Sequence, residues 1–154
     1  MSMNRKPKKA KGSQQVLPVW TYIQAQSVVP YLTSVMRSLR DHQLEVQKSD
    51  LATRRLANKP GRPDRATLIA QHEAVQETQR AWERYDDALE ELNSLGIFCL
   101  DAVDGEALVP FEHENQLAWF LFDLFDRRPF RFWRFDSDNL DTRRPIREVT
   151  NHLP

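Results

Sequence analysis

The sequence predicts an α+β protein, in which a long antiparallel helical hairpin is followed by a small antiparallel β-sheet. Three observations support this fold class. Two long segments with helical periodicity are separated by a turn rich in proline and glycine at residues 58–63. Gly96 follows the second segment, where a helix is expected to end. After Gly96 the chain changes to short apolar and aromatic runs bounded by turns, which are typical of strands.

The hairpin is expected over about residues 21–95. Thr21 and Gln24 have the spacing of a capping box, in which each side chain bonds a free backbone N–H at the start of a helix. A proline interrupts the helix that begins there. We therefore expect a short helix over about 21–28 and a longer one over about 29–57.

A seven-residue repeat of large apolar side chains predicts which face of the second long helix packs on the first. That helix is expected to start after Asp64, a suitable N-cap residue. Trp82 is expected to be buried at the centre of the main seam, and a second seam runs beside it. The main seam consists of Leu68, Val75, Trp82 and Leu89, and the second of Gln71, Thr78, Tyr85 and Leu92.

The sheet is expected over about residues 97–136, beside the base of the hairpin, and a C-terminal segment over 137–154 follows it. Residues 16–154 then form a single domain. Periodicity alone allows residues 117–123 to be a strand or one face of a helix, and their aromatic content favours a strand.

Two irregularities are expected within the sheet. Pro110 has no backbone N–H, which confines its stretch to a sheet edge or a bulge. The apolar parity changes between Phe132 and Trp133, and such a change indicates a bulge or a strand that is covered on both sides.

The N-terminal tail is basic. Residues 1–12 carry five basic side chains and no acidic one, and since the whole chain is neutral, the remainder has a net charge of −5. Low apolar content predicts that residues 1–15 are disordered, because ordering them would lose entropy without forming a core. A basic arm can bind nucleic-acid phosphates, although a solubilising terminus is the commoner role. The basic residues are Arg5, Lys6, Lys8, Lys9 and Lys11.

Composition limits the protein class. The chain has 154 residues and one cysteine, Cys99, so it has no internal disulfide and no cysteine metal site. No apolar run approaches the roughly 18 residues that a membrane span needs. The tail lacks the apolar stretch of a secretory signal, and we expect a cytoplasmic protein without membrane contact.

Several short motifs carry a likeness to a known group of sequences. They are Ala25, Val28-Val29-Pro30, Leu95–Asp101, Leu108–Phe111, Leu117–Asp123, Phe132-Trp133-Arg134 and Arg143–Ile146. Through them the chain resembles the uncharacterised bacterial family called domain of unknown function 2203, from about Trp20 to Ile146. The family has no assigned activity, so the resemblance bears on the fold and implies no reaction.

The chain departs from that family at four positions. Where relatives tend to carry an acid, a cysteine, a glycine and a histidine, this chain has Pro110, Ala118, Phe122 and Arg134. A reactive or metal-binding centre built on those groups would be largely lost here. The residues of these motifs that remain as candidates for binding, or for an enzyme as a third alternative, are Asp123, Arg134 and Arg144.

No catalytic constellation emerges from the other residues. The four histidines lack the spacing of a metal site, and the four glycines form no phosphate-binding loop. Cys99 lies in an apolar stretch, as an inert buried thiol does. The sequence therefore predicts no catalytic residue, no metal and no cofactor, and it favours a protein that is not an enzyme.

Residues 127–135 interleave arginine with aromatic side chains. This pattern is typical of surfaces that bind single-stranded nucleic acid, where rings stack on bases and guanidinium groups hold phosphates. A sheet that buries its rings and solvates its charges explains the pattern equally well. The stretch adds Arg131 and Trp133 to the candidate binding residues.

Two functions from different classes follow. The first is a non-enzymatic interaction or structural protein that uses the hairpin for self-association or for binding another protein. A homodimer is expected because several aliphatic side chains lie near the hairpin tip, far from the sheet. The second is a nucleic-acid-associated protein that uses the basic tail and the arginine–aromatic stretch. The tip residues are Leu51, Leu56, Leu68 and Ile69.

Overall fold

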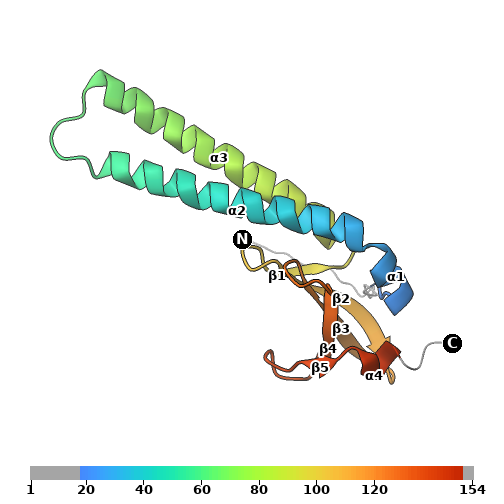
Figure 1. Ribbon diagram of the computed structural model, residues 1–154. Helices are drawn as coiled ribbons and strands as arrows, with labels where there is room; N and C mark the ends of the chain where they lie inside the picture. The colour runs from blue at the N-terminus through green and yellow to red at the C-terminus, as the bar shows by residue number, and fades with distance from the viewer. Residues whose placement is uncertain (1–17, 151–154) are drawn as a thin grey trace, which may run out of the picture.

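The computed structural model describes residues 18–150 and contains a long helical hairpin beside a five-stranded antiparallel sheet. The hairpin projects well beyond the sheet, which lies beside its base (Figure 1). The predicted α+β fold is confirmed, and the basic tail lies outside the described residues. The elements are α1 (Tyr22–Ser27), α2 (Val29–Ala57), α3 (Arg65–Asn93), β1 (Phe98–Asp101), β2 (Glu106–His113), β3 (Gln116–Asp123), β4 (Phe130–Phe135), β5 (Arg144–Pro145) and α4 (Arg147–Thr150).

The predicted helix boundaries are confirmed by their caps. Thr21 accepts a hydrogen bond from the backbone N–H of Gln24, and the Gln24 side chain accepts one from the N–H of Thr21, which completes the capping box. Asp64 accepts a hydrogen bond from the N–H of Thr67 at 2.8 Å and caps α3. Gly96 has a φ of +75°, a conformation that glycine adopts readily after a helix.

The face of α3 that contacts α2 lies one residue away from the predicted main seam. Trp82 is 44% exposed, whereas its neighbour Ala81 is fully buried. Thr78 meets Thr53 of α2 with 3.4 Å between the hydroxyl oxygens. The prediction was thus wrong for Leu68, Val75 and Trp82 of the main seam, whereas Leu89 is half buried against the core, and it was correct for the second seam. The inward-facing rows are Thr67, Ala74, Ala81 and Ala88, and beside them Gln71, Thr78, Tyr85 and Leu92.

The sizes of the side chains explain this choice of face. Helix α2 directs large apolar side chains inward, and α3 meets them with a row of alanines and threonine. Small side chains allow two helix axes to approach closely, because the interaxial distance depends on the residues at the contact. The first three large residues of the heptad, Leu68, Val75 and Trp82, are therefore left on the outside of α3. The buried apolar residues of α2 are Leu32, Val35, Met36, Leu39 and Val46.

The sheet is a meander, in which each strand pairs with the next one along the chain. Residues 117–123 belong to a strand, as their aromatic content predicted. Between β3 and β4 the register shifts from Leu121–Phe132 to Phe122–Phe130, which leaves Arg131 as an extra residue. The expected bulge is present, slightly before the parity change that indicated it.

Pro110 occupies a local edge of the sheet. Strand β1 pairs with β2 only as far as Leu108. On the edge of β2 that faces β1, Pro110 therefore has no strand beside it. The backbone N–H of Trp20 donates to the Pro110 carbonyl there at 2.8 Å. The indole Nε1 of Trp20 donates to the Leu95 carbonyl at 3.1 Å, and this one residue therefore joins the hairpin to the sheet.

The two faces of the sheet have different environments. The inner face packs its rings against α1 and α2 in one buried cluster, where Phe111 and Phe120 stack with centroids 3.8 Å apart and Tyr22 meets Phe120 edge-on. The opposite face, called the outer face below, carries the alternate residues of each strand. Leu108, Leu121 and Phe132 lie next to one another on it, because they are paired in register.

Candidate functional site

Two of the candidate residues, Trp133 and Arg144, lie together and serve the core. Trp133 is 2% exposed on the inner face of the sheet. The guanidinium of Arg144 lies 5.3 Å from its ring centroid and 5.0 Å from that of Phe135. Arg144 also forms a bidentate ion pair with Asp138, through hydrogen bonds of 2.8 and 2.9 Å. This arrangement attaches β5 to the sheet.

The ion pair shifts the pKa values of both of its partners. The hydrogen bonds from Arg144 lower the pKa of Asp138 to about 2, with a further contribution from the backbone N–H of Phe135. The same pairing raises the pKa of Arg144. Both groups therefore stay charged at neutral pH, and the hydrogen bonds between them are charge-assisted. We call this ion pair between Asp138 and Arg144 the latch.

Asp123 and Arg131 lie together at another place, on the outer face of the sheet. One oxygen of Asp123 accepts a hydrogen bond from the Phe125 N–H at 3.0 Å. Arg131 pairs with Asp126 through two contacts, of 2.9 Å from Nε and 3.1 Å from Nη2. Asp123 and Arg131 both line the same pocket, described below.

Arg134 joins neither group. It is 4% exposed, stands opposite Trp119 in the ladder and donates from Nη1 to the Phe135 carbonyl at 3.2 Å. Phe130 and Trp133 are each 2% exposed, so their rings have no open surface on which a base could stack. Phe132 and Phe135 of the same stretch are half buried. The nucleic-acid hypothesis, which also involves the basic tail outside the described residues, stays a prediction.

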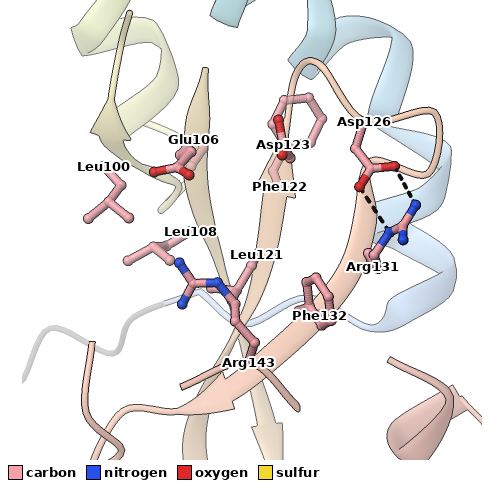
Figure 2. A pocket seen from close by; sticks show the side chains of 11 residues that line it. Leu100, Glu106, Leu108, Leu121, Phe122, Asp123, Asp126, Arg131, Phe132 and Arg143 are labelled. Atoms are coloured by element: carbon pink, nitrogen blue, oxygen red, sulfur yellow. Dashed lines mark hydrogen bonds and ion pairs between the residues drawn. The ribbon is translucent and has the colours of Figure 1, made fainter. Parts of the chain in front are cut away.

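The pocket on the outer face has a volume of about 100 Å³. Leu108, Leu121 and Phe132 form its apolar floor, in the row where β2, β3 and β4 are paired. Figure 2 shows the carboxylates along one side of this floor, and the Arg143 side chain reaching over the floor with its guanidinium beside Leu108 and Leu121 in this view. Arg143 is held in place by donating from Nη1 to the carbonyls of Leu140 and Thr142 at 3.0 Å each.

The acidic side of the pocket is built by strand register. Asp101 pairs with Glu106 across β1 and β2, and Glu106 pairs with Asp123 across β2 and β3. Three carboxylate-bearing residues therefore stand in one row across three adjacent strands. Like charges directly opposite one another in a sheet are unfavourable. Asp123 was among the candidates predicted from the sequence, whereas Asp101 and Glu106 were not, since turns separate the three segments.

Glu106 responds electrostatically to this arrangement. Its burial raises its pKa, and the neighbouring Asp104, Asp123 and Asp101 raise it further, while Arg143 acts in the opposite direction. Among residues 18–150, the Glu106 carboxylate forms no side-chain hydrogen bond and no ion pair. The carboxylate thus faces more negative than positive charge and has no bound cationic partner there.

A second surface feature lies on the hairpin. Large apolar side chains of both helices remain between 44% and 53% exposed, and we call those that share one side of the hairpin the outer strip. On α3 they follow the heptad that was predicted to be the buried seam. The exposure expected near the tip is confirmed for Leu51, Leu68 and Ile69, and Leu56 is half buried. The outer strip consists of Leu51 on α2 and Leu68, Val75 and Trp82 on α3.

The residues of the outer strip on the two helices share one side of the hairpin. The opposite side is a charged groove lined by His42 of α2 and Arg84 of α3. Leu51 follows His42 by nine residues, and Val75 precedes Arg84 by nine. Nine residues correspond to about 2.5 helical turns, so both apolar residues point away from the charged groove.

Cys99, the metal-ligand types and the helices were the remaining places where the described residues could carry chemistry or cross a membrane. Burial raises the pKa of the half-buried Cys99 thiol to about 11, which keeps it protonated and weakly nucleophilic at neutral pH. Over residues 18–150, no three His, Cys, Asp or Glu side chains are placed to hold a metal ion. In the same range, no helix combines the length and the apolar character needed to cross a membrane.

Comparisons with family models, with curated proteins and with solved structures find no match to this chain. The resemblance to domain of unknown function 2203 therefore stays a prediction.

Proposed function

We propose that this protein is a non-enzymatic interaction protein, which associates with a second copy of itself through the outer strip of the hairpin. The observation that carries the proposal is the exposure of that strip, between 44% and 53% for each residue. The two helices are joined by a different set of side chains, so the strip is not needed to form the hairpin.

The energetics favour covering the strip. Full burial of a large aliphatic or aromatic side chain contributes about 1.5–3 kcal/mol, and roughly half of that is unrealised at half exposure. A two-fold dimer contains the four strip residues of each chain, so its interface covers eight side chains. The free energy gained on burial is the sum over these eight side chains.

A second copy fits the strip better than an unrelated surface. The seven-residue spacing of Leu68, Val75 and Trp82 is the spacing that lets one helix pack along another. A two-fold axis brings the same strip onto itself, which gives a four-helix bundle with the charged grooves on the outside. Arg84, which lines that groove, already pairs with Glu45 and Glu77 of its own chain.

Light scattering of the purified chain at micromolar concentration tests the proposal. The wild type is expected at twice the chain mass of 18.1 kDa. Val75→Glu is expected at the monomer mass, since it places a charge in the centre of the interface. Gln76→Glu is the matched control, because it adds the same charge at the next residue, which is exposed and points to another side of α3.

Circular dichroism of both variants establishes that the fold is retained. A wild-type mass of 18.1 kDa that does not change on concentrating contradicts the proposal. So does a Val75→Glu variant that is folded and still dimeric.

A further inference from the structure

We propose that the pocket on the outer face of the sheet binds the side chain of a lysine from a partner polypeptide. The site is distinct from the outer strip of the hairpin, and neither proposal depends on the other. It combines a narrow apolar floor with carboxylates along one side, which matches an alkyl chain that ends in an ammonium group (Figure 2).

The size of the pocket selects a single aliphatic side chain. An apolar cavity of roughly 150 Å³ accepts a benzene ring, and clefts for drug-sized molecules begin at roughly 300 Å³. The pocket here holds about 100 Å³. It is therefore too small for a nucleobase or a cofactor, and it suits the end of one extended side chain.

The floor of the pocket suits the methylene groups of lysine. Leu108, Leu121 and Phe132 form a continuous apolar row across three strands. Lysine side chains commonly lie along such surfaces and keep the ammonium group at a polar end. Leu100, also in the lining, is 50% exposed and extends the apolar surface toward solvent, where the backbone of a partner would lie.

The charge beside the floor suits the ammonium group. Glu106 and Asp123 are direct neighbours in the ladder, and Asp101 continues the row. The other acid in the lining, Asp126, is already paired with Arg131. Arg143 also lines the pocket and acts on Glu106 at a distance, but the hydrogen bonds of its guanidinium go to backbone carbonyls and to neither Glu106 nor Asp123. A bound cation would relieve the repulsion between Glu106 and Asp123 that the sheet register imposes.

Lysine fits this site better than arginine. A guanidinium group is planar and broad, and it binds best to one carboxylate through two parallel hydrogen bonds. An ammonium group is compact and can lie between two carboxylates from neighbouring strands. Glu106 and Asp123 offer such a pair, whereas Asp126 has its two oxygens engaged by Arg131.

Titration of the ¹⁵N-labelled full chain with N-acetyl-lysine methylamide, followed by NMR, tests the proposal. Saturable shifts are expected at the amides of Glu106, Leu108 and Leu121, with a Kd on the order of millimolar. The norleucine analogue has the same stem without the charge, and it is expected to bind at least about fivefold more weakly. The arginine analogue is also expected to bind more weakly than lysine.

A matched pair of variants tests whether the Glu106 carboxylate binds the ammonium group. Glu106→Gln is expected to weaken lysine binding by about fivefold, whereas Glu112→Gln, on the same strand and outside the pocket, is expected to leave it unchanged. In the wild type, saturation with the lysine probe is expected to lower the pKa of Glu106, because a nearby cation favours its charged form.

Four results overturn the proposal. They are the absence of saturable shifts, equal binding of the norleucine analogue, tighter binding of the arginine analogue, and unchanged binding by Glu106→Gln. The amide spectrum of Glu106→Gln also reports whether that variant is folded, so a loss of binding is assigned to the pocket only when the spectrum is retained.

Discussion

The base and the tip of the molecule are held together in different ways. At the base, rings and large aliphatic side chains from α1, α2 and the sheet form one buried cluster. Toward the tip, α2 and α3 meet through small and polar side chains, such as Thr53 with Thr78, and Gln71 with the Leu56 carbonyl. The apolar side chains of the distal hairpin lie on its outside. Most of the buried apolar core thus lies at the base, while the distal hairpin leaves apolar side chains exposed.

The largest effect is expected from Phe120→Ala at the base. Phe120 is 1% exposed and stacks on Phe111, and removing a buried ring of this kind costs about 3–5 kcal/mol. For a chain of this length the thermal midpoint should fall by roughly 6–20 °C. Phe125→Ala is the control, since Phe125 is 64% exposed. Equal shifts for the two variants would contradict the contrast between buried and exposed rings.

A smaller effect is expected from Gly96→Ala, compared with Gly61→Ala at the tip. Both glycines have a positive φ, which costs other residues about 1–2 kcal/mol. A Cβ at Gly96 would also lie 2.8 Å from Cγ of Pro18, whereas one at Gly61 meets nothing within 4 Å. Chemical denaturation should therefore show the greater loss for Gly96→Ala. A greater loss at Gly61 would mean that the tip is more tightly constrained than the base.

The latch formed by Asp138 and Arg144 predicts a pH dependence. Asp138 has a pKa of about 2 in the folded state, and an unfolded aspartate titrates near 3.9. Its contribution to stability is complete above the unfolded value and is lost as the pH falls from about 4 to about 2. Thermal midpoints of Asp138→Asn should fall less steeply over this range than those of the wild type.

Asp141→Asn is the control for that experiment, because it removes the same charge from an exposed position. It should retain the wild-type slope. If Asp138→Asn also retains that slope, the ion pair does not contribute to stability.

The smallest effect on folding is expected from Trp82→Ala. The ring is 44% exposed, and its edge contact with Tyr85 is worth about 0.5–1.5 kcal/mol. Under dilute conditions, where the chain is monomeric, the thermal midpoint should fall by no more than a few degrees. A fall in thermal midpoint as large as that of Phe120→Ala would contradict the exposed position of Trp82 and would support the buried main seam predicted from the sequence.

The boundaries of the hairpin could be predicted from sequence because local chemistry determines them. The capping box at Thr21, the cap at Asp64 and the glycine at Gly96 each act within a few residues. The packed face of α3 could not be predicted in this way. Small residues recur every seven positions from Thr67, and large ones every seven positions from Leu68, so both rows fit a helical interface. The large inward side chains of α2 decide between them.

The pocket was only partly predictable from sequence, because strand register creates it. Asp123 and Arg131 were identified, but Glu106 enters the site only through its pairing with Asp123. The pairing of Asp101 with Glu106 depends on an irregularity after Cys99 that has no visible mark in the sequence. Trp133 and Arg144 were identified from the same motifs, and they belong to the core and its latch.

The meander topology has a consequence for the speed of folding. Helix α2 contacts its sequence neighbour α3, and each strand pairs with the next, so most ordered contacts close short loops. Proteins rich in such contacts fold faster than those that must first join distant segments. The bonds from Trp20 to Leu95 and Pro110 span much longer stretches of chain. We therefore expect the hairpin and the sheet to form early, and the packing of the hairpin base on the sheet, in which Trp20 takes part, to form later.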